Sequence, residues 1–157
     1  MAVQYDDNEI AGMIGVTKQL PLDCKARMRL KPKRGHLERE MDIDGSDGNK
    51  YRIVLRQNSV NPLDFSVILA LHPAEAGKPF RLLRYNGKSH EHTNKIEGNR
   101  FFDFHIHKAT SRYQELGARE DSYAEPSDSF WDLDSAFKAM MQAAGLVETG
   151  TQQPELF

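Results

Sequence analysis

Cysteine is almost absent from this chain, because Cys24 is the only one among 157 residues. A single cysteine excludes a disulfide within the chain and a multi-cysteine zinc site, so any metal site would have to use histidines and carboxylates. Long apolar runs are absent too, since none approaches the roughly 18 residues that would span a bilayer. The first residues, MAVQYDDNEIAG, lack the basic and apolar regions of a secretory signal. We therefore expect a cytoplasmic protein with no membrane partner.

The common motifs of nucleotide binding and hydrolysis are also missing. There is no G-x-x-x-x-G-K-[ST] loop, no G-x-G-x-x-G turn and no G-x-S-x-G elbow. The acidic stretch EMDIDGSD lacks the spaced glutamate that a calcium loop needs. We therefore expect no cofactor, with a divalent metal ion as the alternative.

Positive charge is scarce at both ends of the chain. The segment from Cys24 to Arg112 holds 18 Lys and Arg residues against 10 Asp and Glu, whereas the two flanks together hold 3 against 13. A basic middle between acidic ends is a feature to weigh when a partner is sought. Interspersed charges that only solvate a sheet would explain the same counts, so the charge pattern leaves both accounts open.

Near the N-terminus the sequence predicts one helix and one strand. Residues 6–19, DDNEIAGMIGVTKQ, have Ile10, Met13 and Ile14 at helical spacing behind acidic residues that suit a helix N-terminus. In the stretch CKARMRLK, which starts at Cys24, apolar and basic residues alternate as they do in a strand.

Most of the following chain has the pattern of strands. HLEREMDIDGSDGNKYRIVLRQ alternates on both sides of a DGN turn, which predicts a β-hairpin. The apolar run 65–72 predicts a central strand, and residues 78–85 and 101–108 predict two more. Because the short connections leave no room for crossover helices, we expect a twisted antiparallel sheet of five or six strands over residues 24–108.

The clearest helix pattern covers residues 128–144. Its apolar residues form one stripe, serines can cap its start and Gly145 can end it. The tail 146–157 has no periodicity and is expected to be loosely ordered. The whole chain, 1–157, is thus predicted to be a single α+β domain in which the C-terminal helix packs on one face of the sheet.

Histidines are concentrated in one segment. Between residues 84 and 108 lie four of the six in the chain: His90, His92, His105 and His107. If 101–108 is a strand, its period of two puts His105 and His107 on the same face, roughly 7 Å apart between Cα atoms. Both histidines would then project from the same side of the sheet.

Arg84 and Tyr85 are neighbours on the preceding strand and must point to opposite faces, so only one of them can join the two strand histidines. The sequence pattern does not decide which one does. His90 and His92 follow in a loop rich in Gly, Ser, Thr and Asn, where NH groups and hydroxyls are available to an anion.

Three interpretations of the histidines are open. In the first, they are half-buried strand residues or solvated loop residues without a functional role. They could instead hold a metal ion, because H-x-H on one strand is a spacing found in real sites. The ligands would then be drawn from His90, His92, His105 and His107. The third interpretation is phosphate chemistry, with ligand-binding residues His90, His92, Lys88, Lys108 and Arg112.

Cleavage of RNA without a metal ion needs little beyond this set, because the 2′-hydroxyl is the nucleophile. The enzyme must deprotonate it, stabilise the phosphorane and protonate the leaving oxygen. The candidate catalytic residues are His105 and His107 as acid and base, Arg84 as the stabilising cation, and Tyr85. The alternative is a noncatalytic module that binds an acidic partner through the same basic face.

The segments LLRYNGKSHEH and FHIHKAT, followed by the amphipathic helix, resemble a group of small bacterial and phage-borne proteins and are similar to the toxins of TumE-type toxin and antitoxin pairs. The resemblance covers roughly residues 27–144. This sequence departs from the toxin-like pattern at Asn86, where an acidic residue is common, and in having a longer loop between the histidines and the helix. The resemblance implies an α+β domain, a mobile-element context and an antitoxin partner. Carried over residue by residue, it gives weight to Arg84, Tyr85, His90 or His92, His105 and His107.

Overall fold

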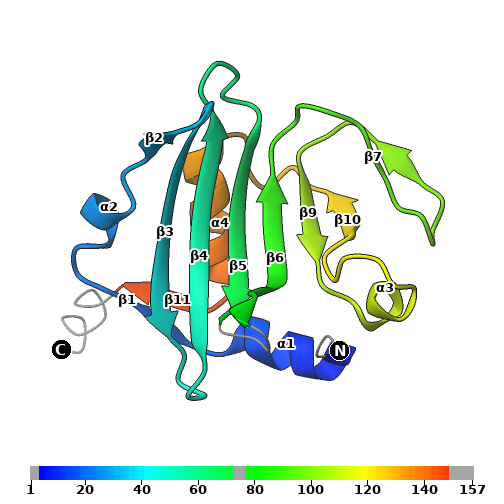
Figure 1. Cartoon of the computed structure of the whole chain (residues 1–157), viewed down its shortest axis with the longest axis horizontal. Helices are drawn as coiled ribbons and strands as arrows, with labels where there is room; N and C mark the ends of the chain where they lie inside the picture. Colours follow the sequence, from blue (N-terminus) through cyan, green and yellow to red (C-terminus); the bar gives the residue numbers. More distant parts are fainter. Residues whose placement is uncertain (1–3, 73–76, 149–157) are drawn as a thin grey trace.

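The computed structural model describes residues 4–72 and 77–148 and has an α+β architecture (Figure 1). Within those ranges, seven strands form an antiparallel sheet in the order β10-β9-β6-β5-β4-β3-β2. The bounds of its strands are β2 (Lys31–Lys33), β3 (His36–Asp44), β4 (Lys50–Asn58), β5 (Phe65–Leu71), β6 (Phe80–Asn86), β9 (His105–Lys108) and β10 (Tyr123–Pro126).

The antiparallel sheet is confirmed, but it has more strands than the five or six predicted. The predicted hairpin is β3 and β4, which pair over their full length from His36 with Asn58 to Asp44 with Lys50. The strands that were not predicted are the two edges, β2 and β10. Both are short and contain a proline, so neither has the alternating apolar pattern of a half-buried strand.

The C-terminal helix α4 (Leu133–Ala143) packs behind the centre of the sheet, as predicted (Figure 1). It begins five residues later than expected, because the Asp132 carboxylate caps the backbone N–H of Ser135 and the Ser135 hydroxyl accepts from the backbone N–H of Asp132. The core between α4 and the sheet includes the fully buried residues Ile53, Val67, Leu69, Leu82, Phe130 and Met140.

At the N-terminus, the predicted helix is α1 (Asp7–Gly15), which ends before residue 19 because Val16 is already extended. The predicted strand starting at Cys24 is wrong, since residues Cys24–Arg27 form the short helix α2. The buried apolar side chains of this segment are Cys24 in α2 and Met28 directly after it, whereas Ala26 between them is exposed. A spacing of four residues is helical, so the apparent alternation was misleading.

A small parallel sheet joins two distant parts of the chain. β1 (Lys18–Leu20) pairs with β11 (Leu146–Glu148), in the register of Lys18 with Leu146. The prediction of a loosely ordered tail is therefore wrong for residues 146–148, and residues 149–157 lie outside the described part of the chain.

Lys18, the first residue of β1 in this small sheet, is fully buried. Its ammonium donates hydrogen bonds of 2.8–2.9 Å to the backbone carbonyls of Ile14, Val16 and Ala144, and lies 4.8 Å from the centre of the Tyr51 ring. Three acceptors match the three protons of an ammonium group, so the side chain is hydrogen-bonded despite its burial.

The predicted strand 101–108 is interrupted. Its first residue, Phe101, belongs to β8 (Arg100–Phe101), which pairs with β7 (His92–Thr93) in a separate two-stranded sheet, and only β9 (His105–Lys108) joins the main sheet. Between β6 and β9 the chain makes an excursion from the main sheet, over residues 87–104. This excursion lies at the edge of the sheet formed by β9 and β10, next to the short helix α3 (Ser111–Glu115) (Figure 1). In the part of the chain that the structure describes, no helix has the length and apolar composition needed to cross a membrane.

Candidate metal centre

Strand register decides which side chains meet on the sheet. His107 on β9 stands directly opposite Arg84 on β6, and His105 stands opposite Asn86. Direct partners in an antiparallel pair share a face, so Arg84 joins the two histidines. Tyr85 stands opposite Ile106 and therefore lies on the other face.

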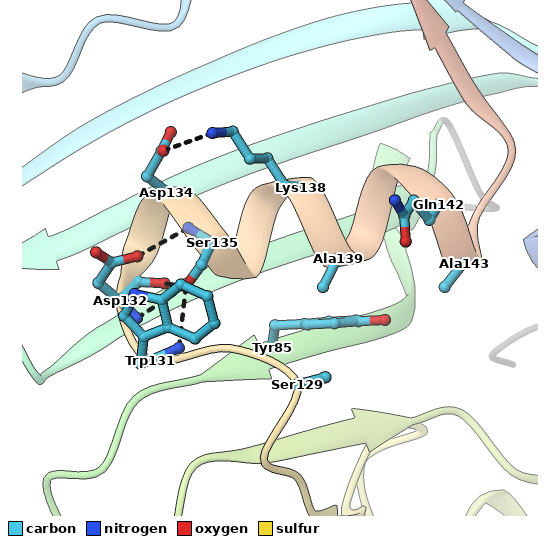
Figure 2. A pocket seen from close by; sticks show the side chains of 10 residues that line it. All are labelled: Tyr85, Ser129, Trp131, Asp132, Asp134, Ser135, Lys138, Ala139, Gln142 and Ala143. Carbon is cyan, nitrogen blue, oxygen red and sulfur yellow. Dashed lines mark hydrogen bonds and ion pairs between the residues drawn. The ribbon is translucent and has the colours of Figure 1, made fainter.

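On that other face Tyr85 is part of the core beside α4. Its ring centre lies 5.3 Å from that of Phe130, and it lines a groove between β6, α4 and the preceding residues Ser129 and Trp131 (Figure 2). The structure thus separates Tyr85 from the candidate catalytic histidines by the thickness of the sheet.

The two strand histidines are buried rather than exposed. His105 is 1% accessible and His107 4%, so the prediction of a His-rich surface is wrong for this pair. His92 on β7 lies against them, with its ring centre 5.5 Å from that of His105 and 4.8 Å from that of His107. Within the described residues, one nitrogen from each of these three histidines lies within 4.8 Å of the other two.

Hydrogen bonds fix the proton positions on the two strand histidines. His105 Nδ1 lies 2.8 Å from the carbonyl oxygen of Asp103, and His107 Nδ1 lies 2.8 Å from that of Asp121. A carbonyl can only accept, so Nδ1 must carry the proton in each ring. The Nε2 atom of both neutral rings is left with its lone pair free to bind a Lewis acid.

Asn94 determines which ring nitrogen of the third histidine, His92, carries the proton. This buried amide donates to the carbonyl of Ala124 at 2.8 Å and its oxygen accepts from the Ala124 N–H at 3.0 Å, which determines which end of the amide is oxygen. That same oxygen is 2.8 Å from His92 Nε2, so Nε2 must be the donor. The lone pair of His92 is therefore on Nδ1.

Burial keeps the strand histidines uncharged near neutral pH. Desolvation lowers the pKa of His105 to about 4. Desolvation, followed by the positive charge of Arg84, lowers the pKa of His107 to about 2. Neutral imidazoles are metal ligands, whereas groups with such low pKa values are poor proton donors at pH 7.

Acid is expected to destabilise the metal-free protein through these two groups. An unfolded histidine titrates near 6.5, above the folded pKa values of about 4 and about 2. As the pH falls below 6.5 the unfolded state binds more protons, so the free energy of unfolding decreases. Between pH 7.5 and 5.5 we expect a loss on the order of 2 kcal/mol, measured by urea unfolding in EDTA. An unchanged value, or an equal loss in a His105→Gln, His107→Gln double variant, would contradict this assignment.

A partly buried ion pair between Arg84 and Asp121 lies next to His107. The Asp121 carboxylate is fully buried and accepts from Arg84 Nε at 2.9 Å, while its backbone carbonyl holds His107. Asp121 therefore fixes two residues of the candidate site at once. The Asp121 carboxylate also offsets part of the positive charge of Arg84, whose side chain is only partly exposed to solvent.

The other predicted ligand-binding residues divide into two groups. His90 is exposed but lines a pocket of about 270 Å³ together with Arg84, His92 and His107. The remaining three lie elsewhere: Lys88 is placed over the Phe102 ring, Arg112 is paired with Glu97, and Lys108 alternates with His107 and so points to the opposite face.

Sequence reasoning missed Asn94 and Asp121. Asn94 lies in a polar loop and Asp121 in a stretch without periodicity, so no local pattern marks either residue. Both act through contacts with distant segments, since Asn94 pairs with Ala124 and Asp121 with Arg84. A buried amide and a buried carboxylate become visible only when the fold is known.

Replacing Asn94 by Ala is expected to weaken metal binding at the three-histidine cluster by roughly 10- to 100-fold. The substitution removes the acceptor that holds the proton on His92 Nε2 and leaves the ring free to rotate or change tautomer. Competition with a chromophoric chelator would measure the affinity. Asn61→Ala, in the β4–β5 loop, is the matched control and should retain the parental affinity. Equal affinities for Asn94→Ala and the parent protein would show that Asn94 does not position His92.

Comparison of the chain with protein-family models, curated proteins and solved structures found no significant match. The resemblance to TumE-type toxins therefore stays a prediction, and the functional argument rests on the geometry of the site.

Proposed function

We propose that this protein binds a divalent transition-metal ion of the zinc class through His92, His105 and His107. The observation that supports the proposal is the clustering of three imidazoles, in each of which an oxygen acceptor holds the proton on one ring nitrogen and leaves a lone pair on the other. In metal sites, ligand histidines are typically oriented by just such hydrogen bonds.

The burial of an unpaired nitrogen supports the same conclusion. His105 Nε2 is buried and has no hydrogen-bond partner among the described residues. Such a group costs about 1–3 kcal/mol if nothing compensates it. A metal ion shared with His92 and His107 would offset that cost, and small side-chain adjustments would bring the nitrogens to tetrahedral spacing around it.

Three protein ligands are the arrangement of catalytic rather than structural zinc sites, because a fourth position stays open to water or substrate. When bound, such an ion acidifies a coordinated water or polarises a substrate oxygen, which is the chemistry of metal-dependent hydrolysis. The pocket beside His92 and His107 is where a substrate would reach that position.

Metal-independent cleavage of RNA by His105 and His107 remains the other candidate from the sequence. Its requirement for a protonated histidine near neutral pH fits poorly with pKa values of about 4 and about 2. The same values suit a metal ligand, since a ring that stays neutral does not have to lose a proton before it binds.

The test of the proposal is metal binding by untagged protein. Stripped protein titrated with Co²⁺ should bind one equivalent and develop the visible absorption of a tetrahedral site, and Zn²⁺ should displace the Co²⁺. Zinc should also raise the thermal midpoint, and EDTA should reverse the increase. Failure to bind any of these ions at micromolar concentration would refute the proposal. RNA cleavage that persists in EDTA would instead favour acid and base chemistry.

A further inference from the structure

The pocket next to the three-histidine cluster carries positive charge. Arg84 and Lys95 line it along with His90, and none of its described lining residues is an aspartate or glutamate. The nearby Glu97 carboxylate is already engaged, because it is ion-paired with Arg112 and accepts a hydrogen bond from the Tyr113 hydroxyl. An anion entering the pocket would therefore meet basic groups and no free carboxylate.

A metal ion on the three-histidine cluster would add to this charge. All three of its members are imidazoles, a ligand that binds metal ions in its uncharged form, so a divalent ion would keep its full charge of +2 instead of being neutralised by carboxylate ligands. The Asp121 carboxylate does not line the pocket and accepts from Arg84. Asp121 offsets part of the Arg84 charge, but Lys95 and a divalent ion would still leave the open coordination position with net positive charge, which favours a doubly charged anion over a singly charged one.

Arg84 is positioned to hold an oxyanion. A guanidinium has five N–H donors, and Asp121 accepts the one on Nε at 2.9 Å. The terminal NH₂ groups can form the paired hydrogen bonds that guanidinium makes with phosphate or carboxylate oxygens. Because Arg84 is the direct cross-strand neighbour of His107, one small anion can contact both the guanidinium and a metal ion on the histidines.

Size limits the ligand. The pocket of about 270 Å³ is smaller than the usual range for drug-sized molecules. It fits a compact charged group, with further parts of the molecule extending into solvent past His90 and Lys95, which are both exposed.

We infer that this pocket binds the phosphate group of a phosphate monoester, with one oxygen on the metal ion and others on Arg84 and Lys95. The inference depends on the proposed metal centre and names the substrate class for it.

Inorganic phosphate is the probe for the test, and the full chain loaded with Co²⁺ is the receptor. At pH 7.5, phosphate should change the visible cobalt spectrum along a saturable one-site curve. Acetate, a singly charged oxyanion, should bind roughly 10-fold or more weakly. Metal-free protein should bind phosphate at least roughly 10-fold more weakly than the cobalt form.

Two variants test the protein side of the pocket. Lys95→Gln should weaken phosphate binding several-fold, and Arg84→Lys should weaken it by roughly 10-fold, because lysine keeps the charge next to Asp121 but loses the paired donors. Lys138→Gln, on α4 at the other face, is the matched control and should leave the phosphate affinity unchanged.

The outcomes separate the two proposals. A chain that takes up no Co²⁺ overturns the metal centre and this inference with it. A chain that takes up Co²⁺ normally but shows no spectral change with phosphate overturns only the inference. The same holds if acetate binds as tightly as phosphate, or if both Lys95→Gln and Arg84→Lys keep full phosphate affinity.

Discussion

His92→Ala is expected to reduce zinc affinity by more than about 100-fold. Loss of a residue that only orients a ligand costs about 10- to 100-fold, so loss of a ligand itself should exceed that range. His92 suits the experiment because it lies on β7, outside the seven-stranded sheet, and is only half-buried. Its replacement should therefore leave the main fold intact, which circular dichroism and urea unfolding of the metal-free variant would check.

His90→Ala provides the matched comparison. His90 is two residues away in the same excursion, but it is not among the three clustered histidines. We expect its zinc affinity to stay within about 3-fold of that of the parent protein, since it contributes no ligand to the cluster. Equal losses for the two variants would contradict the three-histidine centre, as would full zinc affinity in His92→Ala.

Lys18→Met is expected to lower the free energy of unfolding by on the order of 3–4 kcal/mol. The change keeps much of the side-chain volume but removes three hydrogen bonds from the ammonium to the carbonyls of Ile14, Val16 and Ala144. A buried acceptor left without a partner costs about 1–3 kcal/mol, and part of that loss is offset because a buried charge disappears as well. Urea unfolding at pH 7.5 would measure the difference.

Lys138→Met is the control for Lys18→Met. Lys138 is exposed on α4 and forms an i,i+4 ion pair with Asp134, which is worth little at a solvated helix surface. Its replacement should change stability by less than about 0.5 kcal/mol. If Lys18→Met cost no more than Lys138→Met, the hydrogen bonds of Lys18 would not be stabilising the junction between β1 and β11.

Some features of the site follow from local sequence, and others depend on the register between strands. The period of two was sufficient to put His105 and His107 on one face. Whether Arg84 or Tyr85 joins them is set by how β6 aligns with β9, and a shift of one residue would exchange the two. Nothing in LLRY fixes that alignment, because the flanking leucines are equally apolar.

The errors in the fold prediction have a similar origin. The hairpin β3–β4 and helix α4 contain their own patterns and caps, and both were predicted from the sequence. β11 was missed because its three residues are ordered by a partner about 130 positions away. Contacts over such separations leave little trace in a local window of sequence.

The same parallel pairing has a consequence for synthesis of the chain. A ribosome delivers β1 early, but β11 and the Ala144 carbonyl emerge only after every strand of the large sheet. Until then the ammonium of Lys18 lacks one of its acceptors and β1 lacks its partner strand, so this part of the domain cannot close. We therefore expect nascent chains that stop before residue 144 to keep β1 open to proteases, even when the strands of the large sheet have already paired.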